Sequence, residues 1–565
     1  MGKIYWTGHP FVDAGLASIA AVLKVNDLRE IEPDSLSRAV KELKRVLLSN
    51  QSLGLGANKS FAKGTLRALF PDSELANPSS WKGKTEEEKA KNASAKFSEA
   101  IDKELKAALS CLSKEGEETC STCGRRCSME NTFLVRKDKM PLLKGIVNFY
   151  PAFSYGVRIC GVCALALRFL PMSTIRIGGA LWILHTQELA LAKKISELYG
   201  WNHLNKSIAK NEPLSFFSRG QAYDEKSPIL QVLLELLIEH PQELRQAYES
   251  PLPTTAYIFS NDNRGGYLQP IQIPNELLIF LSKFQVLNSR AFIEFKKELL
   301  DIPDNLEKEE LKKRKNFVKE IAKRIIDKES IIKECLVDDA ERLIGGWLGH
   351  RLYLQEVRNL PKGKIAILES LGINIAQSGD SKRYISELRN AKPKDLYGTF
   401  LNYVREKLLT WEEFYTLLPP NEYSSASELR DILLAVIYEW KNCQDKDKEF
   451  PAPIERLDFT PDETIKRIQE IGEKLLKILP NPSRFMGELR TADNIDRIRS
   501  RYLLAVQNGA ISFRDFLFLA PLGDRERTWL LRDYLLAFLF DHARELSLQV
   551  DIEKDEGASS FEKNI

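Results

Sequence analysis

Residues 429–435 have the sequence LRDILLA, and residues 531–537 have the sequence LRDYLLA. At the same offset of 102 positions, TWEEFYTLLP (410–419) aligns with SFRDFLFLAP (512–521). Eleven of the 41 residues between 400 and 440 are identical to their counterparts, far above chance, so this part of the chain contains an internal repeat. Apolar residues recur at helical spacing in both copies. The repeat predicts a duplicated, all-helical C-terminal bundle, with one module at 346–445 and a second at 446–550.

Both copies carry the same signals for where a helix begins and ends. Thr410 and Ser512 are of the type that caps a helix N-terminus, and an acidic residue, Glu413 or Asp515, follows three positions later. A proline stands nine positions after each cap and predicts the end of the helix. Each copy is therefore expected to contain a short helix that starts at a defined N-cap.

The sequence before the repeat has a different character. Over the first 80 residues, short apolar runs alternate with Gly, Pro and Asn, which is typical of mixed strands, helices and loops. Thr85, with Glu88 three residues later, predicts a helix over 85–112. We expect an α+β multidomain fold: a mixed α/β N-terminal domain over 1–345, then the two helical modules, with a disordered tail at 551–565.

Composition limits the classes of function that are open to the chain. Its 565 residues contain 82 Lys and Arg against 79 Asp and Glu, a net charge of +3, so any nucleic-acid surface must come from local patches. No stretch approaches 18 consecutive apolar residues, so no membrane partner is expected. Eight cysteines are too few for a disulfide scaffold of this size. We expect a cytoplasmic protein.

Two Cys-x-x-Cys pairs form the strongest motif. A turn of this kind presents two thiolates to one ion, and two such turns complete a tetrahedral shell for structural zinc. The 36-residue spacer between the pairs requires a folded excursion, so the zinc module is expected at about 111–165. Cys127 is a rival for the fourth position. The predicted ligands are Cys120, Cys123, Cys160 and Cys163.

Motifs of known enzyme classes are missing. The sequence has no GxxxxGK[ST] phosphate loop, no GxGxxG and no GxSxG, and its six histidines include no HExxH pair. We therefore expect a protein that is not an enzyme.

Local basic and glycine-rich segments could bind nucleic acid. Residues 308–324 carry eight basic and three acidic side chains, which fits either a solvated helix face or a stripe that faces phosphates. Two loops combine amide or basic side chains with glycine, although each could also be an ordinary turn. The candidates in these loops are Asn58, Lys59 and Lys63, and Asn261, Asn263, Arg264, Gly265 and Gly266.

Arginines also recur at matching positions of the repeat. Arg389 and Arg490 are such a pair, as are Arg383 and Arg484. They could contact phosphates, or they could form ion pairs within each module, because a glutamate lies four residues after both Arg383 and Arg484.

Taken together, three motifs resemble a known family. TGHPFVDAG (7–15), SNQSLGLGANKSF (49–61) and the two Cys-x-x-Cys pairs are similar to the large subunit of type I-B CRISPR surveillance (Cascade) complexes, in its zinc-bearing subtype. His9 stands where that family usually has Asn. The resemblance covers the first 165 residues by motif, and it implies that the four cysteines bind zinc.

The resemblance also implies a function and a set of partners. A guide RNA would read the target sequence, while this non-catalytic subunit would recognise the protospacer-adjacent motif in double-stranded DNA, help to open the strands and contact the 5′ handle of the guide. Its partners would be the repeated backbone subunit, the handle-binding subunit, the small subunits and a recruited helicase-nuclease. Two other hypotheses fit the residues: a zinc-containing nucleic-acid enzyme and a helical-repeat protein scaffold.

Overall fold

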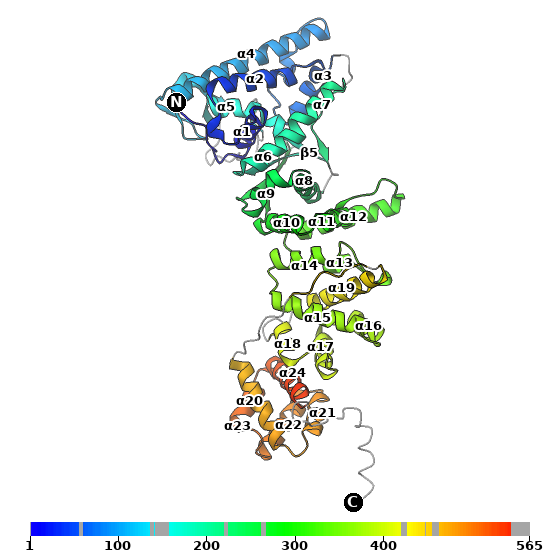
Figure 1. Ribbon diagram of the computed structural model, residues 1–565. Coiled ribbons are helices and arrows are strands. Elements are labelled where there is room, and N and C mark those ends of the chain that lie inside the picture. The colour runs from blue at the N-terminus through cyan, green and yellow to red at the C-terminus, as the bar shows by residue number, and fades with distance from the viewer. Residues whose placement is uncertain are drawn as a thin grey trace, which may run out of the picture. The chain divides into compact units, whose positions relative to one another are not determined.

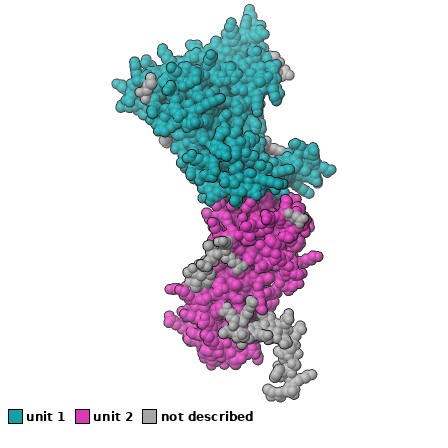
Figure 2. Space-filling model, viewed as in Figure 1, with its two compact units in different colours: residues 1–329 teal, residues 330–565 magenta. Residues whose placement is uncertain are grey.

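The computed structural model describes residues 2–55, 60–135, 140–141, 157–219, 224–260, 267–419, 426–446, 448–454 and 463–543. The chain divides into two compact units, Met1–Glu329 and Ser330–Ile565, coloured teal and magenta in Figure 2. Residues 330–345, which the sequence analysis placed at the end of the N-terminal domain, group with the second unit. The expected tail, 551–565, lies outside the described residues.

A mixed five-stranded sheet forms part of the core of the N-terminal unit. Its strand order is β7-β5-β6-β8-β9, and every neighbouring pair is antiparallel except β5 and β7. Side chains of β6 are buried almost throughout, which explains its nearly continuous apolar sequence. The strands are β5 (Ile175–Ile177), β6 (Ala180–Thr186), β7 (Ser218–Arg219), β8 (Thr254–Ser260) and β9 (Tyr267–Ile273).

Three helices support the cysteine-rich segment, and one of them, α1, packs against β6 of this sheet. They are α1 (Pro10–Leu23), α4 (Glu86–Ser113) and α5 (Gly161–Arg168), and α5 contacts both of the others (Figure 1). The backbones of α1 and α5 approach closely: a Cβ on Gly15 would lie 1.9 Å from the carbonyl oxygen of Ala166. The helix predicted over 85–112 is confirmed as α4, and Thr85 caps it by accepting the N–H of Glu88.

Further helices and short strand pairs complete the N-terminal unit. The helices are α2 (Pro33–Leu47), α3 (Asn50–Leu53), α6 (Leu189–Ile195), α7 (His203–Ala209), α8 (Lys226–Glu239), α9 (Pro241–Glu249), α10 (Asn275–Leu287), α11 (Ser289–Leu300) and α12 (Lys308–Ile326). The strand pairs are β1 (Glu118–Thr119) with β2 (Arg126–Cys127), and β3 (Thr132–Val135) with β4 (Val157–Cys160).

The C-terminal unit is helical apart from one small hairpin of β10 (Leu336–Val337) and β11 (Arg342–Leu343) within its described residues. The first group of helices is α13 (Ile332–Cys335), α14 (Trp347–Glu356), α15 (Lys362–Gln377), α16 (Ser381–Asn390), α17 (Leu396–Arg405), α18 (Trp411–Leu417) and α19 (Ala426–Asp445). The second group is α20 (Glu463–Ile478), α21 (Pro482–Arg490), α22 (Ile495–Gln507), α23 (Phe513–Leu519) and α24 (Arg525–His542).

The aligned sequences of the repeat make the same local contacts. Thr410 with Glu413, and Ser512 with Asp515, close reciprocal capping boxes at the start of α18 and α23. Farther along, one arginine on α19 and one on α24 each bind the aspartate that follows it and the carbonyl oxygen of a distant alanine. These groups are Arg430, Asp431 and Ala391 in the first copy, and Arg532, Asp533 and Ala492 in the second.

The two copies differ in what covers their outer face. In the first copy, Trp411 is fully buried, because its ring packs 5.3 Å from that of Phe538 on α24. The hydroxyl of Tyr534 on α24 also donates to the carbonyl oxygen of Leu418. In the second copy, Phe513 occupies the position of Trp411 and is 59% exposed. We use the name terminal face for the exposed apolar side chains of α22, α23 and the residues just after α23, which are Leu503, Leu504, Phe513, Leu517 and Leu522.

Candidate metal centre and nucleic-acid interface

Four cysteines from the two motif pairs converge at one point of the N-terminal unit. Their sulfur atoms all lie within 4.8 Å of one another. The Sγ atoms of Cys120 and Cys163 are 3.8 Å apart, and those of Cys123 and Cys160 are 3.6 Å apart. Two ligands at the usual Zn–S distance of about 2.3 Å in a tetrahedron are separated by about 3.8 Å, so these sulfurs can bind a metal such as zinc.

The first pair sits on a tight turn between β1 and β2. The N–H of Gly124 donates to the carbonyl oxygen of Cys120. The N–H of Cys120 in turn donates to the carbonyl oxygen of Arg125. Gly124 has a φ of +70°, a conformation that favours glycine, which is why glycine directly follows Cys123. This local geometry turns both thiols of the pair toward the same side.

The second pair spans the junction of β4 and α5. Cys160 ends the strand and is the N-cap residue of α5, while Cys163 lies in the first turn of the helix. Gly161 lets α5 approach α4 closely, since a Cβ there would lie 2.4 Å from the backbone nitrogen of Ala108. The metal centre is therefore held between the β1–β2 turn and the α4–α5 contact.

The surroundings favour a thiolate at Cys120. Hydrogen bonds from the thiols of Cys123, Cys160 and Cys163 lower the pKa of Cys120 well below its usual range. The backbone N–H of Cys160 also donates to the Sγ atom of Cys120, at 3.2 Å. Because metal ions bind the thiolate form, this arrangement suits a metal ligand.

Cys127, the rival ligand, is buried on β2 but does not belong to the converging set. It pairs with Glu118 in the β1–β2 hairpin. In the part of the chain that the structure describes, the four predicted cysteines form the one group of three or more potential metal ligands.

The motif TGHPFVDAG builds a second polar cluster beside α1. The carboxylate of Asp13 is buried and accepts hydrogen bonds from the N–H and hydroxyl of Thr7 and from the N–H of Gly8. The Nε2 atom of His185 lies 3.0 Å from the same carboxylate. His9 caps α1 through Nδ1, and burial lowers its pKa to about 4. The sequence analysis missed His185, because no local pattern links residues 172 positions apart.

Lys63 lines a surface cavity of about 610 Å³ in the N-terminal unit. Its ammonium group lies 3.4 Å from a carboxylate oxygen of Glu86 and 4.5 Å from the ring centre of Trp81. Arg176 of β5 lines the same cavity, and sequence analysis did not single it out. The other candidates of this loop, Asn58 and Lys59, lie outside the described residues.

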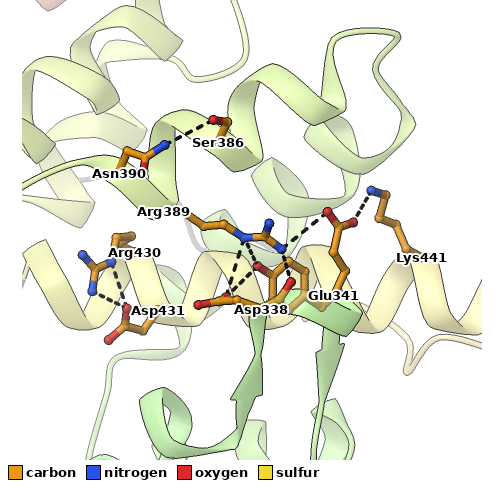
Figure 3. A network of polar contacts seen from close by, with 9 residues as sticks. Asp338, Glu341, Ser386, Arg389, Asn390, Arg430, Asp431 and Lys441 are labelled. Atoms are coloured by element: carbon orange, nitrogen blue, oxygen red, sulfur yellow. Dashed lines mark hydrogen bonds and ion pairs between the residues drawn. The ribbon is translucent and has the colours of Figure 1, made fainter.

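Arg389 belongs to a network within the C-terminal unit, shown in Figure 3. Its Nε atom donates to the hydroxyl of Tyr438 at 2.6 Å, and its Nη2 atom donates to the carbonyl oxygen of Asp338 at 2.6 Å. Glu341 lies 3.4 Å from the same guanidinium and also accepts from Lys441. These contacts connect α16 and α19 to the β10–β11 hairpin.

Arg383, Arg389 and Arg484 of the repeat thus have partners within their own unit. Arg383 lies 3.8 Å from Glu387, and Arg484 lies 2.9 Å from Glu488, as the ion-pair alternative predicts. Arg490 is half-buried at the end of α21. The loop candidates Asn261, Asn263, Arg264, Gly265 and Gly266 lie outside the described residues.

Among the helices that the structure describes, none combines the length with the apolar composition that a bilayer-spanning segment needs. We also compared the chain with family models, with curated proteins and with solved structures, and none of these three comparisons found a match.

Proposed function

We propose that this chain is the non-catalytic large subunit of an RNA-guided CRISPR surveillance complex, with structural zinc at the four cysteines. The observation that carries the proposal is that the three resembling motifs share one hydrophobic core. Phe11 of the first motif, Phe61 of the second and Cys160 of the second cysteine pair all belong to it. Segments that are far apart in the sequence therefore depend on one another structurally, which supports treating them as one functional assembly rather than as three chance matches.

In the proposed complex the guide RNA reads the target, and this subunit recognises a short flanking motif in duplex DNA. The cavity lined by Lys63 and Arg176 is our candidate for that contact, because it offers two cationic groups. Lys and Arg side chains are suited to reading base edges in a groove. Strand opening and contact with the 5′ handle of the guide would involve further basic surfaces of the chain.

The terminal face supports contact with helical partners. In stacked helical repeats, the last unit normally ends in a polar surface, because an apolar one would be exposed to water. Here the last copy exposes Phe513, whereas α24 covers the equivalent Trp411. We propose that a helical small subunit of the complex covers this face. The repeated backbone subunit, the handle-binding subunit and a helicase-nuclease would contact other parts of the chain.

The decisive experiment is co-purification. The tagged chain is expressed with its genomic neighbours, and the RNA that accompanies it is sequenced. A discrete set of repeat-derived RNAs is expected, together with stoichiometric zinc. Purification free of RNA would contradict the proposal. Metal-dependent cleavage of nucleic acid by the isolated chain would favour a zinc-containing enzyme, and nuclease-resistant protein partners without RNA would favour a scaffold.

A further inference from the structure

Helix α12 carries a row of lysines along one side. The spacings between them are four, three, four and four residues. At about 100° per residue, these positions fall within a sector of about 80° of the helix circumference, and at about 1.5 Å per residue the row is about 22 Å long. We call this row the lysine stripe, and its members are Lys308, Lys312, Lys315, Lys319 and Lys323.

The helix itself does not neutralise the stripe. The three acidic residues of α12, Glu309, Glu310 and Glu320, project from other sectors by the same helical geometry. Glu320 is already paired with Arg324, at 3.0 Å. Within the described part of the chain, Arg324 pairs with Glu320 and Glu329, and no lysine of the stripe forms an ion pair.

Neighbouring elements within the described residues form no ion pair with the stripe either. Helix α12 packs against α8 and α11 (Figure 1), and its buried side chains are apolar. A cavity of about 540 Å³ beside it is lined by Lys315 and Lys319. Among the acidic groups of that cavity, Glu235 pairs with Arg219 and Asp301 pairs with Lys296. The third, Asp224, accepts the neutral hydroxyl of Ser227 and, within the described residues, forms no ion pair with Lys315 or Lys319.

We infer that the lysine stripe binds the phosphodiester backbone of a single-stranded nucleic acid. Five like charges in a row repel one another, and a linear polyanion relieves that repulsion along its whole length. Successive lysines lie roughly one helical turn, about 5.4 Å, apart. A flexible single strand can adapt to this straight row, whereas each strand of a rigid duplex places its phosphates about 3.4 Å apart along the axis, on a curved path.

Lysine is a compact point charge that contacts phosphate without reading a base. Binding at the stripe is therefore independent of sequence, unlike the contact proposed at the Lys63 cavity. The inference rests on the proposed nucleic-acid role, but its test uses the purified full-length chain without guide RNA, so the two can fail separately.

The test compares two triple variants that lose the same charge. One removes the centre of the stripe through Lys312→Gln, Lys315→Gln and Lys319→Gln. The control changes three exposed lysines of α4, where Glu99 and Asp102 interrupt the positive charge. The control substitutions are Lys96→Gln, Lys103→Gln and Lys106→Gln.

Binding of a labelled, mixed-sequence DNA strand of about 30 nucleotides is followed by fluorescence anisotropy at salt concentrations from roughly 50 to 300 mM. Each lost phosphate contact on a single strand lowers the slope of log K against log salt by about 0.7, so the stripe variant should lose about 2 in slope while the control retains the parent slope. Circular dichroism and zinc content verify that both variants are folded.

Three outcomes would overturn the inference: no binding of the strand by the parent at low salt, equal slopes for the parent and the stripe variant, or an equal loss in the control. A slope change confined to duplex DNA would also contradict it, because the proposed ligand is a single strand. The chain could fail to co-purify with guide RNA and the stripe variant could still lose slope. That result would contradict the proposed function but would support single-strand binding at the stripe.

Discussion

Arg168 shows how a single side chain can join distant segments. It is buried on α5, where its Nε atom donates to Glu104 of α4 at 2.8 Å and its Nη1 atom donates to Glu74 at 2.8 Å. Each carboxylate also accepts a second bond from Nη2. Since α5 carries Cys163, these bonds from Arg168 to Glu104 and Glu74 help to fix the helix that supports the metal centre.

Replacing Arg168 by Met should therefore be costly. The change leaves the buried carboxylate of Glu104 without its counter-charge, and removing one partner of a buried pair typically costs about 3–5 kcal/mol. Urea denaturation should show this loss in the free energy of unfolding. Arg245→Met is the control, because its pair with Glu249 is exposed and worth at most about 1 kcal/mol. Similar losses in the two variants would contradict the expectation.

His350 should make the C-terminal unit sensitive to acid. It is buried on α14, its Nε2 atom donates to the carbonyl oxygen of Ile344 at 2.7 Å, and burial lowers its pKa to about 4. The unfolded chain, with a histidine pKa of about 6.5, binds the proton more readily. The stabilising contribution is therefore complete above pH 6.5 and is lost as the pH falls toward 4, by up to about 1.4 kcal/mol per pH unit.

The variant His350→Gln keeps a donor for Ile344 and removes this titration. Its free energy of unfolding should fall less steeply than that of the parent between pH 6.5 and 4, as measured by urea denaturation at several pH values. His9, whose pKa burial also lowers to about 4, is present in both chains and cancels in the comparison. Parallel pH profiles would show that His350 does not titrate in this range.

At the scale of single elements, local sequence predicted local structure well. The N-caps at Thr85, Thr410 and Ser512 are confirmed, because a capping side chain and its N–H partner lie within three residues of each other. The four cysteines were also predictable, since each Cys-x-x-Cys turn presents its two thiols together whatever the rest of the fold does.

Contacts between elements were not predictable in the same way. Arg389 binds Tyr438 and the carbonyl oxygen of Asp338, which are 49 and 51 residues away, and nothing near Arg389 indicates either partner. Asp13 and His185 meet only because α1 packs against the sheet. Arg176 reaches the Lys63 cavity through the pairing of β5 in the sheet. Long-range packing decides such sites, and one sequence does not encode it in a local pattern.

The two equivalent aromatic residues of the repeat should respond differently to truncation. Trp411→Ala removes a fully buried ring from the contact with α24 and should cost about 3–5 kcal/mol of unfolding free energy. Phe513→Ala removes an exposed ring and should change stability by about 0.5 kcal/mol or less. Chemical denaturation of both variants checks this, and a comparable loss for Phe513→Ala would mean that another part of the chain covers the terminal face.

The metal centre should depend on the two thiols that the β1–β2 turn supplies. Replacing Cys120 and Cys123 by Ser should abolish zinc binding, because the β1–β2 turn then offers no thiolate. Limited proteolysis should show new cleavage near this turn. Cys111→Ser is the matched control: Cys111 is buried on α4 in the same hydrophobic core but lies outside the converging four, so zinc measured by elemental analysis should stay at the parent level. Equal zinc in the double variant and the parent would exclude this site.

For the whole molecule, charge and apolar surface are arranged unevenly. The net charge of +3 gives no indication of the lysine stripe on α12. The average composition gives no indication of the terminal face. Local surfaces, rather than the overall balance, decide what such a chain contacts. In the proposed assembly the two surfaces have different partners, a nucleic-acid backbone and a helical subunit, so each can be altered without the other.

The terminal face can be tested in the assembled complex. Phe513→Ser with Leu517→Ser should release the helical small subunits and leave guide RNA and zinc in place, because the substitutions remove apolar contact area far from the metal centre in sequence and in another unit. Native mass spectrometry of the purified complex measures the subunits directly. Leu134→Ser with Ile293→Ser is the control, since both side chains are exposed and apolar but belong to the N-terminal unit. An unchanged subunit count in the first variant, or an equal loss in both, would show that small subunits bind elsewhere.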